Sequence, residues 1–424
     1  MTIEKVVYIY HTKKGYMQRK ITQTLRFAIG ISFFTFILIG INDGAVGVLL
    51  PGMQTTYHTG KGTISLLFLA GTCGYFIASF NNGLLLEKLG NRRFLLLATL
   101  IMGLGFALLS SRPPFFLLLL GIVPVGFGVA MLDAGLNSYI ARLPDNTTLL
   151  NYLHAFYGIG ALLGPLVASG FLALGFVWNS VYFVWIGLSI LVLFGISLAF
   201  PRREKASHTE EQKAGGNVLI FALRQPVVWL AAFFLLVYVG TEVSLGVWSF
   251  SFLLQERHGQ LLISGWTVSG YWIGLTLGRL LLGRVARRIG NRRLIEVCLS
   301  GVVFGMLLIW IVPQLAVASI ALFITGFCLG PIFPTTIALM SDALPSRIVP
   351  SAIGFLASFG SMGGALLPLI AGNLAQHFGM WILIPYVIAL TAIMLLLWVI
   401  MQSSQIASPK SSKRQHSKNI PLHP

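Results

Sequence analysis

Twelve long runs of apolar residues, separated by short polar segments, dominate the chain. An α-helix rises 1.5 Å per residue and needs about 20 apolar residues to cross the hydrocarbon core of a bilayer. The runs are close to that length, so the pattern predicts twelve transmembrane helices. The predicted spans are roughly residues 27–52, 63–85, 93–110, 114–141, 150–174, 179–200, 227–254, 263–284, 293–312, 315–342, 350–376 and 381–402.

The composition supports an all-α membrane protein. The 424 residues are 56% hydrophobic and only 10% charged, and the mean hydropathy is +0.83. A soluble domain carries about 25% charged residues. Lipid must therefore cover most of the surface of this protein.

The basic residues are distributed unevenly across the predicted membrane. All but three of the 29 Lys and Arg residues lie in the N-terminal segment, the C-terminal tail or beside the loops after even-numbered spans; the exceptions are Lys61, Arg112 and Arg257. Because basic residues are retained in the cytoplasm, we expect a multi-pass protein of the cell (inner) membrane with both termini cytoplasmic. The net charge of +17 then faces anionic lipid, and we expect no nucleic-acid partner.

A repeat divides the chain into two halves. The tetrapeptide Gly-Asn-Arg-Arg stands at 90–93, after the second span, and again at 290–293, after the eighth. This offset predicts two pseudo-symmetric six-helix bundles. The predicted organisation is an N-terminal cytoplasmic segment (1–26), a first bundle (27–200), a polar cytoplasmic linker (201–226), a second bundle (227–402) and a cytoplasmic tail (403–424).

The first copy of the repeat belongs to a longer pattern, Gly83-x-x-x-Glu87-Lys88-x-Gly90-Asn91-Arg92-Arg93. It resembles the loop signature G-x-x-x-D-R-x-G-R-R between helices 2 and 3 of the major facilitator superfamily. The resemblance implies the major facilitator fold and a secondary transporter that works by alternating access. Glycines allow helices to approach closely, and an acidic residue among basic residues can form ion pairs that stabilise one conformation. Alternatively, the basic residues could serve only to set the orientation of the chain in the membrane. The predicted gating residues are Gly83, Glu87, Gly90, Arg92, Arg93, Gly290, Arg292 and Arg293.

Three acidic residues, Asp43, Asp133 and Glu242, fall inside predicted spans. A charge at the middle of the membrane costs at least about 2.5–3.5 kcal/mol, so these groups should face the bundle interior or water. An acid without a cationic partner can be buried in its neutral form and can carry a proton. We predict proton coupling through Asp133, with Asp43, Glu242 and His154 as further candidates. A hydrogen-bonded structural role or direct solute binding is the alternative for Asp133, and a packing role is the alternative for His154.

The surroundings of Asp133 extend the resemblance. Asp133 and Asn137, one helical turn apart, are similar to a Glu and an Asn on helix 4 of the fucose:proton symporter branch. Asn42-Asp43 before Leu49-Leu50-Pro51 resembles its helix 1, and Phe333-Pro334-Thr335 resembles its helix 10. The resemblance implies a solute site between the halves, where aromatic rings could stack on a sugar, although aromatic residues in helices more often pack. The predicted solute-binding residues are Asn42, Asn137, Tyr238, Trp248, Tyr271 and Thr335.

One motif favours a different solute. Gly160-Ala161-Leu162-Leu163-Gly164-Pro165 resembles the G-x-x-x-G-P motif of drug:proton antiporters, but Gly364-Ala365-Leu366-Leu367-Pro368 repeats the theme and supports a scaffold role. We therefore predict a proton-coupled sugar or sugar-like symporter; the alternative is a multidrug:proton antiporter. A non-transporting membrane receptor is disfavoured by the intact deep acids. No nucleophile–base pair, phosphate loop or metal-ligand spacing is present, so we expect no enzyme, metal or cofactor. We expect a monomeric transporter whose partners are a small molecule and protons.

Overall fold

The computed structural model describes residues 3–143, 146–200, 217–345 and 347–406. These residues form helices joined by short connections, with no strand among them. The helices are α1 (Ile3–Tyr57), α2 (Lys61–Ile64), α3 (Leu66–Ser110), α4 (Phe115–Ala141), α5 (Asn146–Ala173), α6 (Ser180–Ala199), α7 (Asn217–Leu223), α8 (Pro226–Glu256), α9 (Leu261–Ile289), α10 (Asn291–Ile311), α11 (Leu315–Leu329), α12 (Ile332–Ala343), α13 (Val349–Phe378), a 3-10 turn (Met380–Ile382) and α14 (Leu383–Ile406).

Helix α3 folds back on itself at Gly90. The backbone of Gly90 has φ 70° and ψ 161°, a left-handed φ that glycine adopts without steric cost. Gly74, before this point, packs against Val123 of α4, and Gly105, after it, packs against Val125. Both arms of α3 therefore run beside the same stretch of α4, and α3 crosses the membrane twice.

The described helices account for the predicted twelve crossings. Ten segments are long and apolar enough to cross a membrane, and the longest, Lys61–Ser110, has 50 residues and contains both arms of α3. Helix α9 is not among the ten, but it has 29 residues and packs between α5 and α11. The two arms of α3 and the added α9 bring the number of crossings to twelve.

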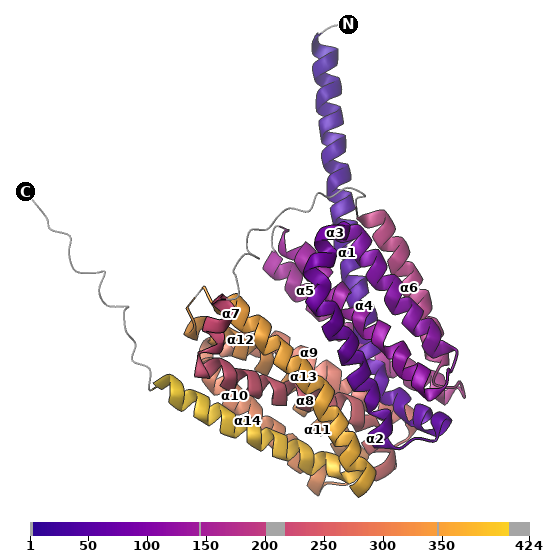
Figure 1. The fold of residues 1–424 in the computed structure, drawn as a ribbon, viewed down its shortest axis with the longest axis vertical. Coiled ribbons are helices and arrows are strands. Elements are labelled where there is room, and N and C mark those ends of the chain that lie inside the picture. Colours follow the sequence, from indigo (N-terminus) through magenta and orange to yellow (C-terminus); the bar gives the residue numbers. More distant parts are fainter. Residues whose placement is uncertain (1–2, 144–145, 201–216, 346, 407–424) are drawn as a thin grey trace, which may run out of the picture.

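Two bundles are present, an N half (α1–α6) and a C half (α8–α14), inclined to one another in Figure 1. Equivalent helix pairs pack in each: α1 against α5 in the N half and α8 against α13 in the C half. A Cβ on Gly160 of α5 would overlap the Ile37 backbone, and a Cβ on Gly363 of α13 would overlap the Leu236 backbone. The glycine-rich motif of α5 thus lies at a close helix contact, which supports its interpretation as scaffold.

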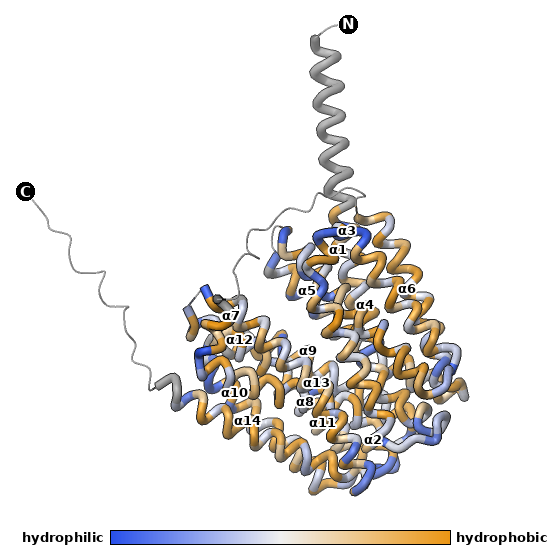
Figure 2. Tube along the Cα trace, in the orientation of Figure 1, coloured by the Kyte–Doolittle hydropathy of each residue, from blue (hydrophilic) through white to orange (hydrophobic). Residues whose placement is uncertain are grey.

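Apolar side chains cover the outside of the bundles. Phe116, Phe194, Ile311 and Leu396 are each more than half exposed. Figure 2 shows apolar residues along the outer helices and polar residues gathered near the helix ends. This surface suits contact with lipid chains.

The two halves meet at the end of the molecule that carries Gly60, here called the Gly60 end. The backbone N–H of Lys61 donates a 2.6 Å hydrogen bond to Gln376 Oε1 of α13, and Gly62 lies against Asn373. Deeper in the membrane, Phe68 of α3 packs edge-on against Trp248 of α8, with 6.5 Å between ring centroids. The halves are closed against each other at this end.

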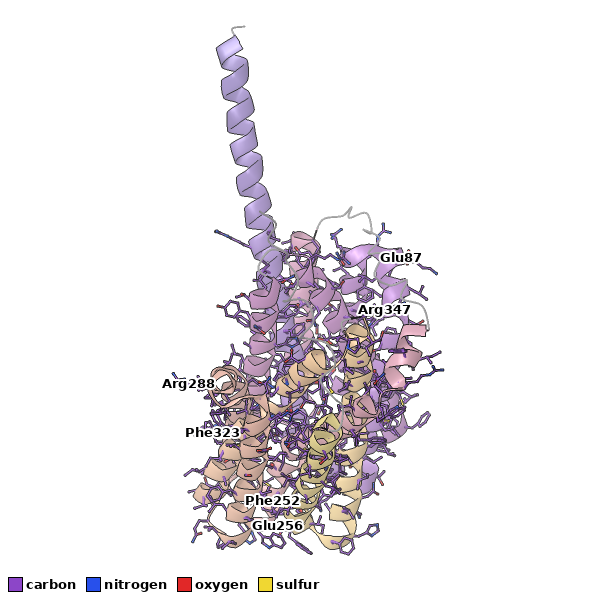
Figure 3. The ribbon with its side chains drawn as sticks, turned by 90° about the vertical axis from the view of Figure 1, so that its left-hand side faces the viewer. Glu87, Phe252, Glu256, Arg288, Phe323 and Arg347 are labelled. Atoms are coloured by element: carbon purple, nitrogen blue, oxygen red, sulfur yellow. The ribbon has the colours of Figure 1, made fainter. Side chains whose placement is uncertain are left out.

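At the opposite end, which carries Gly90, the same helix faces are uncovered. Eleven residues, or about three turns, after Phe68, Ser79 of α3 is exposed. Five turns before Gln376, Ser358 of α13 is exposed, and a Cβ on nearby Gly354 would meet no atom within 4 Å. From these exposed faces we infer a cleft between the halves that opens toward the Gly90 end. Figure 3 shows Glu87 and Arg347 toward this end and Glu256 at the other.

Three elements differ from the prediction. Helix α1 begins at Ile3, well before the predicted span at 27–52, and α7 occupies part of the predicted linker at 201–226. The predicted span 315–342 is divided into α11 and α12 at Gly330-Pro331. The remaining linker residues up to 216, and the tail from 407, lie outside the described residues.

The division of this helix has a direct cause in the sequence. Pro331 and Pro334 lack the N–H groups that would bond the carbonyls four residues earlier, those of Phe327 and Gly330. The carbonyl of Gly330 is therefore available to a side chain. Its partner, Arg279, belongs to the site described below.

Candidate functional site

Asp133 lies inside the N half and is bonded to neutral side chains. Its Oδ1 accepts a 2.8 Å hydrogen bond from Asn137 Nδ2, one turn further along α4. Its Oδ2 accepts a longer bond, 3.4 Å, from the hydroxyl of Tyr75 on α3. The predicted pairing of Asp133 with Asn137 on one helix face is confirmed.

Asp43 has a similar environment at the contact between α1 and α5. Asn42 Nδ2 donates to its Oδ1 over 3.1 Å, and the hydroxyl of Tyr157 on α5 donates to its Oδ2 over 3.1 Å. Gly40, three residues before Asp43, packs against the Tyr157 backbone. The absence of a side chain at Gly40 thus lets α5 bring the phenol to the carboxylate.

The two acids of the N half form a pair of related groups. Asp43 and Asp133 are close enough to interact electrostatically. Neither makes an ion pair among the described residues; each is held by one amide and one phenol. Tyr75 and Tyr157 were not singled out from the sequence, because they lie 58 and 114 residues from the acids they bond.

Glu242 differs from both, because it is ion-paired. Arg279 Nη2 of α9 lies 3.0 Å from Glu242 Oε1 and 3.3 Å from Oε2. The Tyr238 hydroxyl also donates to Glu242 Oε2, and the Tyr271 hydroxyl donates to the Glu242 backbone carbonyl over 2.9 Å. Glu242 therefore has a cationic partner, unlike the unpaired acid that the proton-carrier prediction assumed. We do not carry that assignment forward for Glu242.

This network also fastens the interrupted helix of the C half. Tyr238 donates a 3.0 Å hydrogen bond to the carbonyl of Leu329. Arg279 Nε donates a 3.3 Å bond to the carbonyl of Gly330, which Pro334 leaves without its helical partner. One tyrosine and one arginine thus join α8, α9 and the break between α11 and α12.

Helix α9 brings Arg279 to the boundary between the halves. A Cβ on Gly158 of α5 would overlap the side chain of Thr276, which lies one turn from Arg279. The charge of Arg279 interacts with His154 and Tyr157 of α5. Through Tyr157, the C-half ion pair and the N-half acid Asp43 face each other across the boundary.

His154, a further candidate for proton coupling, contacts an aromatic ring of the N half. Its side chain is exposed, and its ring packs edge-on against Phe36 with 5.6 Å between centroids. In the described part of the chain no hydrogen bond joins His154 to Asp133. The geometry favours the packing alternative over a direct relay.

Three aromatic residues predicted to stack on a solute are buried. Tyr238, Trp248 and Tyr271 have no exposed surface, and the Trp248 indole N–H donates a 2.9 Å hydrogen bond to the carbonyl of Pro368. The rings of Tyr238 and Tyr271 pack within the C half, and Trp248 also contacts Phe68 of the N half, so we assign all three structural roles. Thr335 is 7% exposed and Asn42 8%; their binding roles stay predictions.

The predicted gating residues lie at the Gly90 end. Gly90 and Gly290 both have positive φ, 70° and 86°, and begin the helical segments that follow them. Arg92 Nη2 donates a 2.9 Å hydrogen bond to the Ser197 carbonyl of α6. Gly83, Glu87, Arg93, Arg292 and Arg293 are exposed. Their gating role stays a prediction.

No group of three His, Cys, Asp or Glu side chains in the described residues could hold a metal ion. Cys73, Cys298 and Cys328 are free thiols.

The model of the Major Facilitator Superfamily matches residues 32–264 and 246–422. The chain belongs to the major facilitator superfamily. It is therefore a membrane-embedded transporter of small molecules, as the loop signature implied.

The names of relatives of this superfamily member indicate different functions. The protein named Bypass of stop codon protein 6 of Saccharomyces cerevisiae is 28% identical, covering 81% of this chain and 76% of the relative. The glucose/mannose transporter GlcP of Bacillus subtilis is 23% identical, covering 82% and 87%. The multidrug efflux pump Tap of Mycolicibacterium fortuitum is 22% identical, covering 85% and 92%.

Solved structures of transporters share the fold. The nucleoside transporter NupG matches with TM-score 0.74 and 14% identity, over 91% of this chain and 100% of its own. A bacterial homolog of the human lysosomal transporter Spinster, inward-facing and unoccupied, gives 0.73 and 14%, over 91% and 97%. The transporter FucP in the outward conformation gives 0.59 and 17%, over 89% and 98%.

Proposed function

We propose that this transporter is a proton-coupled symporter that carries a sugar or a similar small hydrophilic solute across the cytoplasmic membrane. One observation carries the proposal: Asp133 and Asp43 lie inside the N half with neutral hydrogen-bond partners only. A carboxylate without a cation is costly to bury in a membrane, whereas a protonated carboxyl group is not. Closing the site around these acids therefore favours a proton on them.

The same argument couples proton movement to conformational change. While the cleft is open, water can solvate Asp133 and exchange its proton. When the halves rock to close the cleft, the closed conformation costs less free energy with Asp133 protonated than with Asp133 ionised. We assign Asp133 as the main proton carrier and Asp43 as a second acid of the same site, with Asn137 and Asn42 beside them as solute hydrogen-bonding groups.

The basic loops indicate which side of the membrane the cleft faces. Under the positive-inside rule the Gly90 end faces the cytoplasm and both termini are cytoplasmic, so the cleft is inward-open. We propose that Glu87 pairs with basic residues across the Gly90 end when that end closes.

Multidrug:proton antiport is the second candidate, favoured by the similarity to the efflux pump Tap. Its cavity should be lined by apolar side chains and should accept lipophilic cations. The interior of this protein instead presents amides, phenols and a guanidinium toward the space between the halves. We therefore favour a hydroxyl-rich solute, and we expect a monomer that works without a metal, a cofactor or a nucleic-acid partner.

Transport in vesicles discriminates the two candidates. Right-side-out vesicles with an acidic exterior should accumulate labelled D-glucose, D-mannose or L-fucose, and a protonophore should abolish the accumulation. If no sugar accumulates and inverted vesicles expel ethidium when acidified inside, the symporter proposal is wrong and the antiporter is correct.

A further inference from the structure

Arg279 of α9 is a partly exposed cation in the C half. Its three hydrogen bonds to Glu242 and Gly330 use Nη2 and Nε, and Nη1 takes part in none of them. The side chain of Arg279 is 35% exposed, whereas that of Glu242 is 12% exposed. The cation therefore lies on the open side of the ion pair and the carboxylate lies behind it.

The surroundings fix the orientation of this group. Two partners from different parts of the C half hold the guanidinium, and Pro334, which has no N–H, leaves the carbonyl of Gly330 without its helical donor. A planar guanidinium fixed at two points offers its remaining N–H groups in a set direction. Such preorganisation suits binding, because little side-chain entropy is lost when a ligand arrives.

A second unpartnered donor lies on the same face of α9. Trp272, seven residues or almost two turns before Arg279, is 6% exposed, and its indole N–H has no partner among the described residues. Between them, Thr276 packs against Gly158 of the N half. Thr276 and Arg279 on this face are therefore close to α5 of the N half, whereas the Trp272 ring lies against Gly246 of α8.

We propose that Arg279 is a solute-binding residue that donates hydrogen bonds to hydroxyl oxygens of a neutral, polyhydroxylated solute. This inference rests on the proposed sugar transport and names the C-half side of its site. The solute then bridges donors of the C half and the acid–amide pairs of the N half. A solute that bridges the two halves stabilises the conformation in which the cleft is closed.

The charge balance selects the class of solute. Glu242 compensates the charge of Arg279, so the site has no net positive charge that would need an anion. The group that projects toward the solute is nonetheless the guanidinium, which repels a cation and attracts an oxygen lone pair. A neutral hydroxyl meets both conditions. Arg279 therefore disfavours the binding of cationic drugs and favours the binding of sugars.

Exchange of labelled D-glucose across proteoliposome membranes, without a pH gradient, tests binding separately from proton coupling. Four proteins are compared with the wild type: Arg279→Gln, Glu242→Gln, the double variant, and Arg288→Gln as a control at an exposed site on the same helix. We expect the half-saturation concentration to rise at least tenfold in Arg279→Gln and to remain unchanged in Arg288→Gln. The double variant has no uncompensated charge and should fold, but it should not recover glucose affinity.

The double variant separates a binding role from a structural one. If Arg279 only neutralises Glu242, the double variant will exchange glucose with the half-saturation of the wild type, and the inference is overturned. A deoxyglucose series gives an independent readout: the analogue that loses the hydroxyl bound by Arg279 should bind worse than glucose in the wild type and equally in Arg279→Gln. If every deoxy analogue loses affinity by the same factor in both proteins, Arg279 does not contact the solute.

Failure of the proposed function is distinguishable from failure of this inference. A wild-type protein that exchanges none of D-glucose, D-mannose and L-fucose contradicts sugar transport itself, and the hydroxyl assignment of Arg279 with it. Wild-type exchange combined with full recovery in the double variant contradicts only the role of Arg279.

Discussion

The Glu242 carboxylate of α8 and the Arg279 guanidinium of α9 form a 3.0 Å ion pair inside the C half. Removing one partner of the pair leaves an uncompensated charge, which lowers stability, whereas removing both leaves none. We expect Glu242→Gln to lower the melting temperature of the detergent-solubilised protein by several degrees. The double variant with Arg279→Gln should recover most of that loss.

Equal melting temperatures for Glu242→Gln and the wild type would mean that solvent already screens the pair. Glu87→Gln serves as the control, because Glu87 is exposed at the Gly90 end and has no ion-pair partner among the described residues. Its melting temperature should match that of the wild type.

The contact between α1 and α5 depends on Gly160. A Cβ at this position would overlap the carbonyl oxygen of Ile37, so Gly160→Ala should force the helices apart and lower the yield of folded protein. Gly170→Ala in the same helix is the matched control, because a Cβ there meets no atom within 4 Å. Alanine is the better helix former by about 1 kcal/mol, so the control should be as stable as the wild type or more stable. Equal yields of the two variants, by fluorescence-detected size exclusion, would refute the close contact.

The Gly60 end can be locked in the closed conformation. An ideal Cβ on Gly62 lies 3.6 Å from the Cα of Asn373, a separation that permits a disulfide between the two positions. In a protein whose three native cysteines are replaced, Gly62→Cys with Asn373→Cys should cross-link under mild oxidation and stop solute exchange. A reductant should restore the exchange.

A cross-linked protein that still exchanges solute would show that this end need not open during transport. The pair Gly83→Cys with Ser358→Cys, at the open Gly90 end, is the comparison. It should cross-link slowly while the cleft faces this end.

The sequence predicted the framework well for a physical reason. The length of each apolar run is set by the membrane, so spans can be counted from hydropathy alone, and the repeated Gly90 and Gly290 loops mark equivalent positions. The helix break was missed although its cause, Pro331 and Pro334, is visible in the sequence. Prolines are tolerated in transmembrane helices when neighbours satisfy the freed carbonyls, and the neighbour that bonds the Gly330 carbonyl here, Arg279, is distant in sequence.

The site was predicted less completely. Asp133 and Asn137 could be paired because they lie one turn apart on α4, but no local spacing connects Asp43 to Tyr157 or Glu242 to Arg279. Trp248 and Tyr271 were expected to face a solute and are buried instead. A transmembrane helix is apolar on most of its surface, so its pattern does not distinguish a face that packs from a face that lines a cavity.

The proton-coupling role of Asp133 is the central claim, and one substitution tests it most directly. Accumulation of labelled sugar in right-side-out vesicles with an acidic exterior should be measured for the wild type, for Asp133→Asn and for Asp342→Asn, an exposed acid. We predict that Asp133→Asn exchanges sugar across the membrane but cannot accumulate it against a gradient, whereas Asp342→Asn accumulates it like the wild type. Accumulation by Asp133→Asn to the wild-type level would contradict the account.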